Sequence, residues 1–140
     1  MRILKNPQIL NFPKFLDENG SLVVYEGEKE IPFIMQRIFT ISAKKNDLRG
    51  DHAHKKCNQL LICLSGKVLV SCDNGSEVFK YTLDDPASGL LIPECIWAKE
   101  EYLTNDAILM VICNEHYNND DYIRDYKEFK RYLISEDLYD

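Results

Sequence analysis

The sequence predicts a single, mainly β domain of the jelly-roll or β-barrel type, with one amphipathic helix at its C-terminal end. Three observations lead to this prediction. Short runs of β-branched and aromatic residues recur at regular spacing with turn residues between them, as in all-β sandwiches and barrels. The pattern changes once, near residue 117, to an apolar spacing of three and four residues. The length of 140 residues suits one domain with its own core, over residues 1–140.

The expected strands follow a Glu-Asn-Gly turn at residues 18–20 and occupy the chain up to about residue 116. Ser65-Gly66 predicts a tight hairpin between the strands on either side. The run from Asp73 to Ser76 is the strongest turn signal in the chain. The expected strands span residues 21–25, 33–42, 59–64, 67–72, 77–83, 89–92, 95–99 and 107–113.

The C-terminal segment predicts a helix over about residues 120–134, packed on one side of the β domain. Asp120 and Asp121 stand at its expected start, where carboxylates favour the positive end of the helix dipole. The apolar positions with helical spacing are Ile123, Tyr126, Phe129, Tyr132 and Leu133.

Composition excludes several classes of function. The net charge of −6 argues against a general nucleic-acid binder, which usually has a basic face. No apolar run approaches the roughly 18 residues that span a bilayer, and the N-terminus does not resemble a signal peptide. The five cysteines are odd in number and form no CxxC motif, so we expect reduced core residues and a cytoplasmic protein.

The polar cluster from Arg49 to Lys56 holds the residues best suited to chemistry. His52 and His54 are two apart, so on a strand their side chains point to the same face. In a small barrel that face can be the interior, where a ligand binds. The alternative is a pair of surface histidines on a charged loop.

The His-x-His spacing resembles the metal-binding signature of cupin proteins, but two of the four ligand positions are changed. Gln59 stands where that signature has a glutamate, and Ala98 stands where it has a third histidine. Two neutral imidazoles and an amide make a poor site for Mn, Fe or Zn. We therefore expect no metal at this site.

The sequence also resembles the nucleotide-linked sugar 3,4-ketoisomerases, which are small cupin enzymes of the WxcM-like type. The resemblance covers nearly the whole chain, and the string Arg49-Gly50-x-His52-Ala53-His54-Lys55-Lys56 is its most specific part. The weaker motifs, in the same order as in the family, are Asp17 to Leu22, Ile31-Pro32-Phe33, Asp85-Pro86, Trp97, and Tyr117 followed by Asp121 to Phe129.

The resemblance implies an enzyme without a cofactor that acts on dTDP-4-keto-6-deoxyglucose. It would move the keto group from C4 to C3 through an enediol(ate), ahead of an aminotransferase that makes a 3-amino sugar for cell-surface glycans. By the same resemblance His52 is the base at C3, and His54 assists in proton relay or substrate positioning. Histidine suits both tasks because it gains and loses protons near neutral pH.

Cations are needed for the diphosphate, and Arg49 is the first candidate, with Arg37 second, because a guanidinium matches phosphate oxygens. Lys55 is a weaker candidate, since it can equally be a solvated charge. Trp97 either walls the pocket or stacks on the nucleotide, or it packs in the core. Gln59 completes the expected substrate contacts.

Three positions depart from the family. Phe39 and Thr40 stand where relatives have consecutive tyrosines, so a phenolic proton shuttle is missing there, and water or Thr40 is left to complete the relay. Asn19 and Ala98 occupy positions that the family associates with the C4 stereochemistry of the product. The sequence therefore predicts substrate contacts at both positions without assigning a galacto or gluco product.

Two other functions remain open, namely a sugar-nucleotide 3,5-epimerase and a non-catalytic cupin that binds a small ligand. Epimerases of that kind usually pair a histidine with a buried aspartate. The resemblance also implies a homodimer in which the first strands, within residues 1–15, cross to the partner. An exposed sheet edge is unfavourable in a small β protein, which points the same way.

Overall fold

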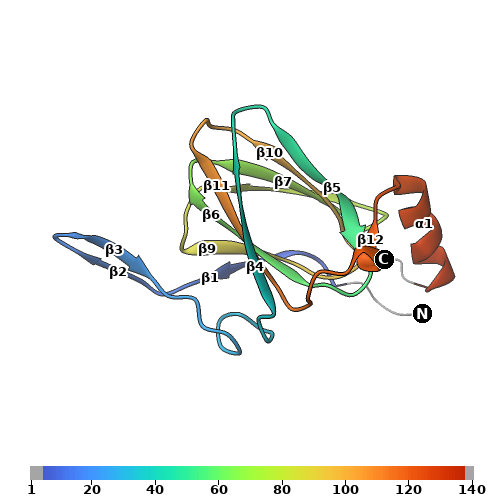
Figure 1. Ribbon diagram of the computed structural model, residues 1–140, viewed down its shortest axis with the longest axis horizontal. Coiled ribbons are helices and arrows are strands. Elements are labelled where there is room, and N and C mark those ends of the chain that lie inside the picture. Colours follow the sequence, from blue (N-terminus) through green and yellow to red (C-terminus); the bar gives the residue numbers. More distant parts are fainter. Residues whose placement is uncertain (1–4, 138–140) are drawn as a thin grey trace.

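The computed structural model describes residues 5–137 and consists of two five-stranded antiparallel sheets, a projecting hairpin and one helix (Figure 1). One sheet has the strand order β1-β9-β6-β11-β4, and the other has the order β12-β5-β10-β7-β8. The elements are β1 (Gln8–Asn11), β2 (Lys14–Asp17), β3 (Gly20–Val23), β4 (Arg37–Ala43), β5 (Leu48–His54), β6 (Gln59–Ser65), β7 (Val68–Asp73), β8 (Val78–Leu83), β9 (Ser88–Ile92), β10 (Trp97–Tyr102), β11 (Ala107–Cys113), a 3-10 turn (Asn119–Asp121), β12 (Tyr122–Ile123) and α1 (Tyr126–Ser135).

The main core lies between the two sheets, and the alternation of side chains along the strands places it there. In β7 buried and half-buried positions alternate along the strand, as period-two side chains require. The largest buried side chains of this core include Leu61, Val70, Leu90, Tyr102 and Leu109, from five different strands. The predicted β class is therefore confirmed, with the strands arranged in two facing sheets rather than one closed barrel over residues 5–137.

The predicted helix begins later than expected. α1 starts at Tyr126, and Asp125 caps it by accepting a hydrogen bond from the backbone nitrogen of Lys127. Asp121 lies in a 3-10 turn instead, and its carboxylate accepts from the backbone nitrogen of Lys56. The prediction that Asp120 and Asp121 begin the helix is wrong, because Asp121 binds the end of β5 and the next two residues form β12.

α1 packs on the outer face of the sheet that contains β5 and β10. Phe129 and Leu133 of the helix are buried in one cluster with residues of this sheet and of the connection between β9 and β10. This packing fixes the C-terminal segment, so that Tyr122 and Ile123 of β12 can pair with β5. The other members of the cluster are Ala53, Cys95, Trp97 and Ile123.

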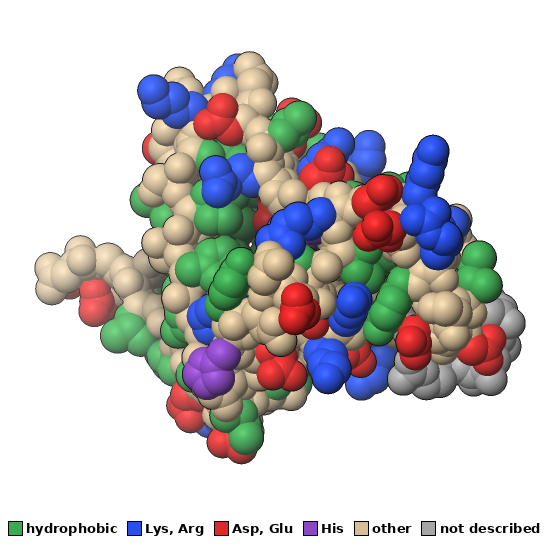
Figure 2. Space-filling model, turned by 45° about the vertical axis from the view of Figure 1, so that its right-hand side comes forward, with side chains coloured by type: hydrophobic (Ala, Val, Ile, Leu, Met, Phe, Trp, Pro, Cys, Tyr) green, Lys and Arg blue, Asp and Glu red, His purple; other side chains and the backbone are tan. Residues whose placement is uncertain are grey.

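Lys and Arg side chains mix with Asp and Glu side chains over the face shown in Figure 2, as expected for a protein with a modest negative charge. No helix within residues 5–137 is long and apolar enough to cross a bilayer. All five cysteines are buried free thiols, which confirms their predicted place in the core.

Candidate active site

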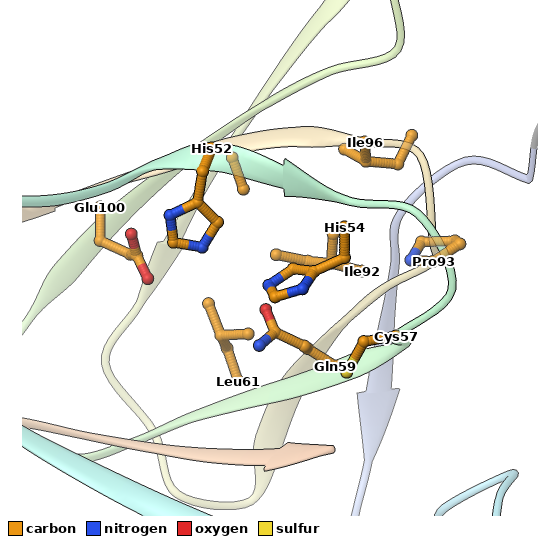
Figure 3. A pocket seen from close by; sticks show the side chains of 10 residues that line it. His52, His54, Cys57, Gln59, Leu61, Ile92, Pro93, Ile96 and Glu100 are labelled. Atoms are coloured by element: carbon orange, nitrogen blue, oxygen red, sulfur yellow. The ribbon is translucent and has the colours of Figure 1, made fainter. Parts of the chain in front are cut away.

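Both predicted histidines point into a pocket between the two sheets (Figure 3). The rings of His52 and His54 lie edge to face, with centroids 5.1 Å apart. His54 is buried and His52 is half-buried, so the alternative of two surface histidines is excluded. The pocket is lined by His52, His54, Cys57, Gln59, Leu61, Ile92, Pro93, Ile96, Ala98 and Glu100.

A β-bulge just before the histidines decides which side chains share their face. β5 and β10 pair Ala98 with His52 and Glu100 with Arg49, and the register shifts between them. Directly opposed residues of antiparallel strands lie on the same face, so Arg49 and His52 both face the pocket side of the sheet. Asp51 is the extra residue, with a φ of 63°.

His54 is held by a carboxylate from the C-terminal segment. Its Nδ1 lies 2.9 Å from Oδ2 of Asp121, which stands immediately before β12. A proton on Nδ1 that is donated to this carboxylate leaves Nε2 as the free lone pair of the neutral ring. Nε2 is buried and has no hydrogen-bond partner among the described residues. The arrangement therefore holds an unprotonated imidazole nitrogen ready for a ligand.

Burial makes both histidines bases that are neutral at physiological pH. It lowers the pKa of His52 to about 4, with a further lowering by His54, while a hydrogen bond to the backbone of Gly50 acts in the opposite direction. Burial also lowers the pKa of His54, although the hydrogen bond and charge of Asp121 partly compensate. Neutral imidazoles are the form that accepts a proton from carbon.

A tyrosine from β12 packs on both histidines, although Phe39 and Thr40 replace the consecutive tyrosines of the family. The Tyr122 ring centroid lies 5.0 Å from that of His52 and 4.4 Å from that of His54. Burial lowers the pKa of Arg37, but Cys113 and the Tyr122 phenol raise it, so the net direction is upward and Tyr122 lies close to the guanidinium. Thr40 is exposed on β4 and Phe39 packs against the core, so neither supplies a hydroxyl to the pocket.

Arg37 is anchored on a buried sulfur atom beneath the pocket. Its Nη2 lies 3.5 Å from Sγ of Cys113, and Nε2 of Gln59 lies 3.5 Å from the same atom. The neighbouring Cys57 thiol lowers the pKa of Cys113; burial opposes this, while Arg37 and Gln59 lower it further. Cys113 is therefore the sulfur on which Arg37 and Gln59 converge.

The structure brings four of the other predicted contacts to the pocket region, and each has a distinct place there. Gln59 and Ala98 line the pocket itself. Arg49 lies at its exposed end, opposite Glu100. Arg37 is close enough to His54 to lower its pKa.

Three predicted contacts lie elsewhere. Trp97 is in the cluster beneath α1, and its Nε1 donates to Oδ1 of Asp51, so the core-packing alternative is the correct one. Nζ of Lys55 lies 5.7 Å from the centre of the Tyr132 ring on α1. Asn19 is exposed in the turn of the β2–β3 hairpin, which projects from the body of the chain (Figure 1).

Sequence reasoning missed Asp121, Tyr122, Arg124 and Glu100. The carbon of the Arg124 guanidinium lies 4.2 Å from the centre of the Tyr122 ring, and its charge lowers the pKa of both histidines. A signal for three of them was present, because residues 121–124 form a run within the family motif. Their assignment to the start of a helix directed them away from the site.

Possible metal ligands also meet at this point. Ligand atoms of His54, Cys57 and Asp121 lie within 4.8 Å of one another. His52 is not among these three residues. Asp121 and Nδ1 of His54 are already joined by their hydrogen bond.

Comparison with known proteins identifies the family. The family profile described as FdtA: WxcM-like, C-terminal matches residues 5–134. The chain is 39% identical over 132 residues to the TDP-4-oxo-6-deoxy-alpha-D-glucose-3,4-oxoisomerase of Aneurinibacillus thermoaerophilus, covering 94% of this chain and 95% of that protein.

Solved structures agree with this relationship. QdtA, a sugar 3,4-ketoisomerase from Thermoanaerobacterium thermosaccharolyticum in complex with TDP, superposes with a TM-score of 0.90 at 34% identity, covering 95% of this chain and 98% of that one. A histidine-to-asparagine mutant of QdtA in complex with TDP-4-keto-6-deoxyglucose superposes with a TM-score of 0.90 at 33% identity, over 94% and 96% of the two chains. The chain therefore belongs to the FdtA family of WxcM-like proteins and is an enzyme of the 3,4-ketoisomerase type, an intramolecular oxidoreductase.

Proposed function

We propose that this chain moves the keto group of dTDP-4-keto-6-deoxyglucose from C4 to C3 by histidine-mediated proton transfer, without a metal ion. The observation that carries the proposal is the pair of neutral imidazoles that share one pocket, with Nε2 of His54 unpartnered within the described chain. The substrate follows from the relatives, since two of them are named for a TDP-linked 4-keto-6-deoxyglucose or bind it.

The chemistry needs one proton to leave C3 and another to reach C4. The C4 carbonyl acidifies the C3 proton, and a neutral His52 removes it to give the enediol(ate). A proton returned to C4 completes the shift. His54, held by Asp121, positions the substrate or carries the second proton. A positioned general base typically contributes about 10²–10⁴-fold to the rate.

The substrate diphosphate requires cations at the pocket mouth. Arg49 is the first candidate, because it is exposed and lies on the pocket side of β5. Arg124 is the second, because it lies over Tyr122 and its charge acts on both histidines. Arg37 is better suited to orienting Tyr122, since Cys113 already holds its guanidinium.

Incubation with dTDP-4-keto-6-deoxyglucose in D₂O, followed by NMR, tests this function. We expect a 3-keto product with deuterium at C4. His52→Asn should lower the rate about 10²-fold or more, because the base is lost. His116→Asn is the matched control, since His116 is the exposed third histidine, and it should keep the wild-type rate. A His52→Asn enzyme with wild-type turnover would contradict the assignment of the base.

The His54–Asp121 pair also supports one alternative, a 3,5-epimerase, because epimerases of that kind pair a histidine with a buried aspartate. The same experiment separates the two functions. Epimerisation places deuterium at C3 and C5 and leaves the keto group at C4. A non-catalytic ligand-binding protein gives no exchange at either carbon.

We also propose a homodimer. Phe15, Leu16 and Leu22 of the projecting hairpin are 62%, 75% and 58% exposed, and a second copy is the simplest cover for them. In the single chain β1 pairs with its own β9, so exchange of first strands would replace this pairing by the same pairing between copies. Light scattering should give twice the chain mass of 16.3 kDa, and Leu16→Asp should shift it toward the monomer.

The product would serve the synthesis of a 3-amino-3,6-dideoxy sugar for cell-surface glycans, because a 3-keto group is what an aminotransferase converts to an amine. We place this reaction in the cytoplasm, where five buried free thiols stay reduced. Coupled incubation with a sugar aminotransferase and an amino donor would give the 3-amino sugar nucleotide.

A further inference from the structure

A buried carboxyl group enters the histidine pocket from β10. Glu100 is 9% exposed, and its side chain points into the same space as His52 (Figure 3). Its Oε2 atom has no hydrogen-bond partner within residues 5–137. Burial of a polar group without a partner costs free energy, so stability alone does not explain a carboxyl group here.

The backbone around the bulge makes room for this carboxyl group. Ala98 and Glu100 are two apart on β10, so they share the pocket face. A Cβ atom at Gly50 would overlap Oε2 of Glu100, and Gly50 has a φ of +79°, which favours glycine. The same bulge that aims Arg49 thus leaves the space in which Glu100 lies.

Burial also keeps Glu100 partly protonated at neutral pH. It raises the pKa of this carboxyl to about 7, while the charge of Arg49 acts in the opposite direction. The titratable groups that face it are Arg49 and His52 from β5, Cys72 from β7 and Tyr102 from β10. A protonated carboxyl group can donate a hydrogen bond from one oxygen and accept one at the other.

We propose that Glu100 is a catalytic residue that relays a proton between the two sugar oxygens during the keto shift. This proposal rests on the proposed function, because the isomerisation needs such a transfer. The hydroxyl at C3 must lose a proton and the carbonyl oxygen at C4 must gain one. A carboxyl group can perform both parts and return to its starting state.

The relay returns both side chains to their starting states. His52 takes the proton from C3, a C3=C4 double bond forms, and Glu100 donates its proton to the former carbonyl oxygen at C4. The other oxygen of Glu100 then takes the proton from the hydroxyl at C3, whose oxygen becomes the new carbonyl. The proton on His52 exchanges with solvent, and the electron pair of the double bond then takes a proton from His52 at C4. Both side chains end as they began, and no oxidant or reductant is used.

The other side chains that line the pocket are less suited to this transfer. The amide of Gln59 can donate and accept hydrogen bonds, but it does not exchange a proton with its acceptor. The thiol of Cys57 is held protonated, because its hydrogen bond to Cys113 and burial both raise its pKa. Glu100 is the lining residue with an ionisable oxygen acid.

The variant Glu100→Gln tests the relay, since it keeps size and hydrogen bonding but cannot transfer a proton. Two rates are measured with dTDP-4-keto-6-deoxyglucose in D₂O, namely exchange of the C3 proton and appearance of the 3-keto product. We expect the product rate to fall about 10²–10⁴-fold, while C3 exchange stays within about threefold of wild type. Glu101→Gln, on the next position of β10, is the matched control and should change neither rate.

Three results would overturn the relay. One is a Glu100→Gln enzyme that forms product at the wild-type rate. Another is an equal fall in both rates, which would place Glu100 in the step at carbon. The third is a loss of TDP affinity or of the thermal unfolding transition that matches the loss of rate, which would make its role structural. A wild-type enzyme that forms no 3-keto product would overturn the proposed function as well, which separates the two failures.

Discussion

Nδ1 of His54 lies 2.9 Å from Oδ2 of Asp121, and this contact joins residues that are 67 positions apart in the chain. The second carboxylate oxygen of Asp121 accepts a hydrogen bond from the backbone nitrogen of Lys56. One side chain therefore fixes both the imidazole and the end of the strand that carries it. The C-terminal segment reaches the candidate site through this contact, although most of it packs outside the sheets.

Asp121→Asn should lower kcat about 10²-fold, a loss of the size that follows when a proton-transfer group is displaced, while TDP affinity changes little. An asparagine can donate its amide hydrogen to Nδ1, which would leave the proton of the neutral ring on Nε2. Steady-state kinetics and calorimetry with TDP measure the two effects. Asp120→Asn is the control, because Asp120 is the exposed neighbour. Equal kcat values for the two variants would show that the contact does not set the tautomer for catalysis.

The pH dependence of kcat/KM should have two limbs. The acid limb should fall with a pKa of about 4, well below the ordinary histidine value, because His52 is an active base only above that pH. The alkaline limb should fall with a pKa of about 7 as Glu100 loses its proton. Glu100→Gln should abolish the alkaline limb in the residual activity. An acid limb near pH 6.5 would show that His52 is not the base.

Folding stability should also report on Glu100. Its folded-state pKa of about 7 lies above the ordinary value of 4.5, so the folded chain holds a proton that the unfolded chain has lost between these pH values. Stability from this group is therefore complete below pH 4.5 and falls as the pH rises through 7, by about 3 kcal/mol in total. Urea unfolding at pH 5 and pH 8 should show a smaller pH difference in Glu100→Gln. Identical differences in the two proteins would place the carboxyl group in water.

Removal of metal ions should leave turnover unchanged. Gln59 and Ala98 occupy two of the positions that supply ligands in metal-binding cupins, and His52 lies outside the group of His54, Cys57 and Asp121. Dialysis against a chelator followed by the product assay measures this. A loss of activity that Zn²⁺ or Mn²⁺ restores would contradict metal independence.

The alternation of side chains along strands explains why the histidine pair could be predicted from the sequence. Their prediction required that residues 52–54 lie on a strand and that one face of this strand points to the interior. The resemblance of residues 49–56 to the family implies both. Gln59 followed from its spacing to the pair, and Ala98 followed from the resemblance of residues 93–98 to the later cupin motif, where it takes the place of a third histidine. These predictions depend on local order, which a sequence records directly.

The remaining site residues lie where the structure departs from the regular strand and helix patterns that the sequence suggests. The sequence predicted a helix start at Asp121, because carboxylates are common at that position. In the structure Asp121 accepts a hydrogen bond from the backbone of Lys56, and Tyr122 pairs with β5. Glu100 stands in the run Lys99-Glu100-Glu101, which is typical of a solvated strand edge, and only the fold shows that one of its charges points inward. Arg49 reaches the pocket side only because of the bulge.

Asp51 is one residue more than regular pairing of β5 with β10 would need, and the bulge absorbs it. Deletion of Asp51 would leave Arg49 two positions before His52, so a regular strand would keep both side chains on the pocket side. One further residue inserted beside Asp51, with the bulge kept, would instead turn Arg49 outward, while His52 and His54 would keep their direction. Such an insertion offers a route to an enzyme with weakened nucleotide binding and intact proton-transfer groups.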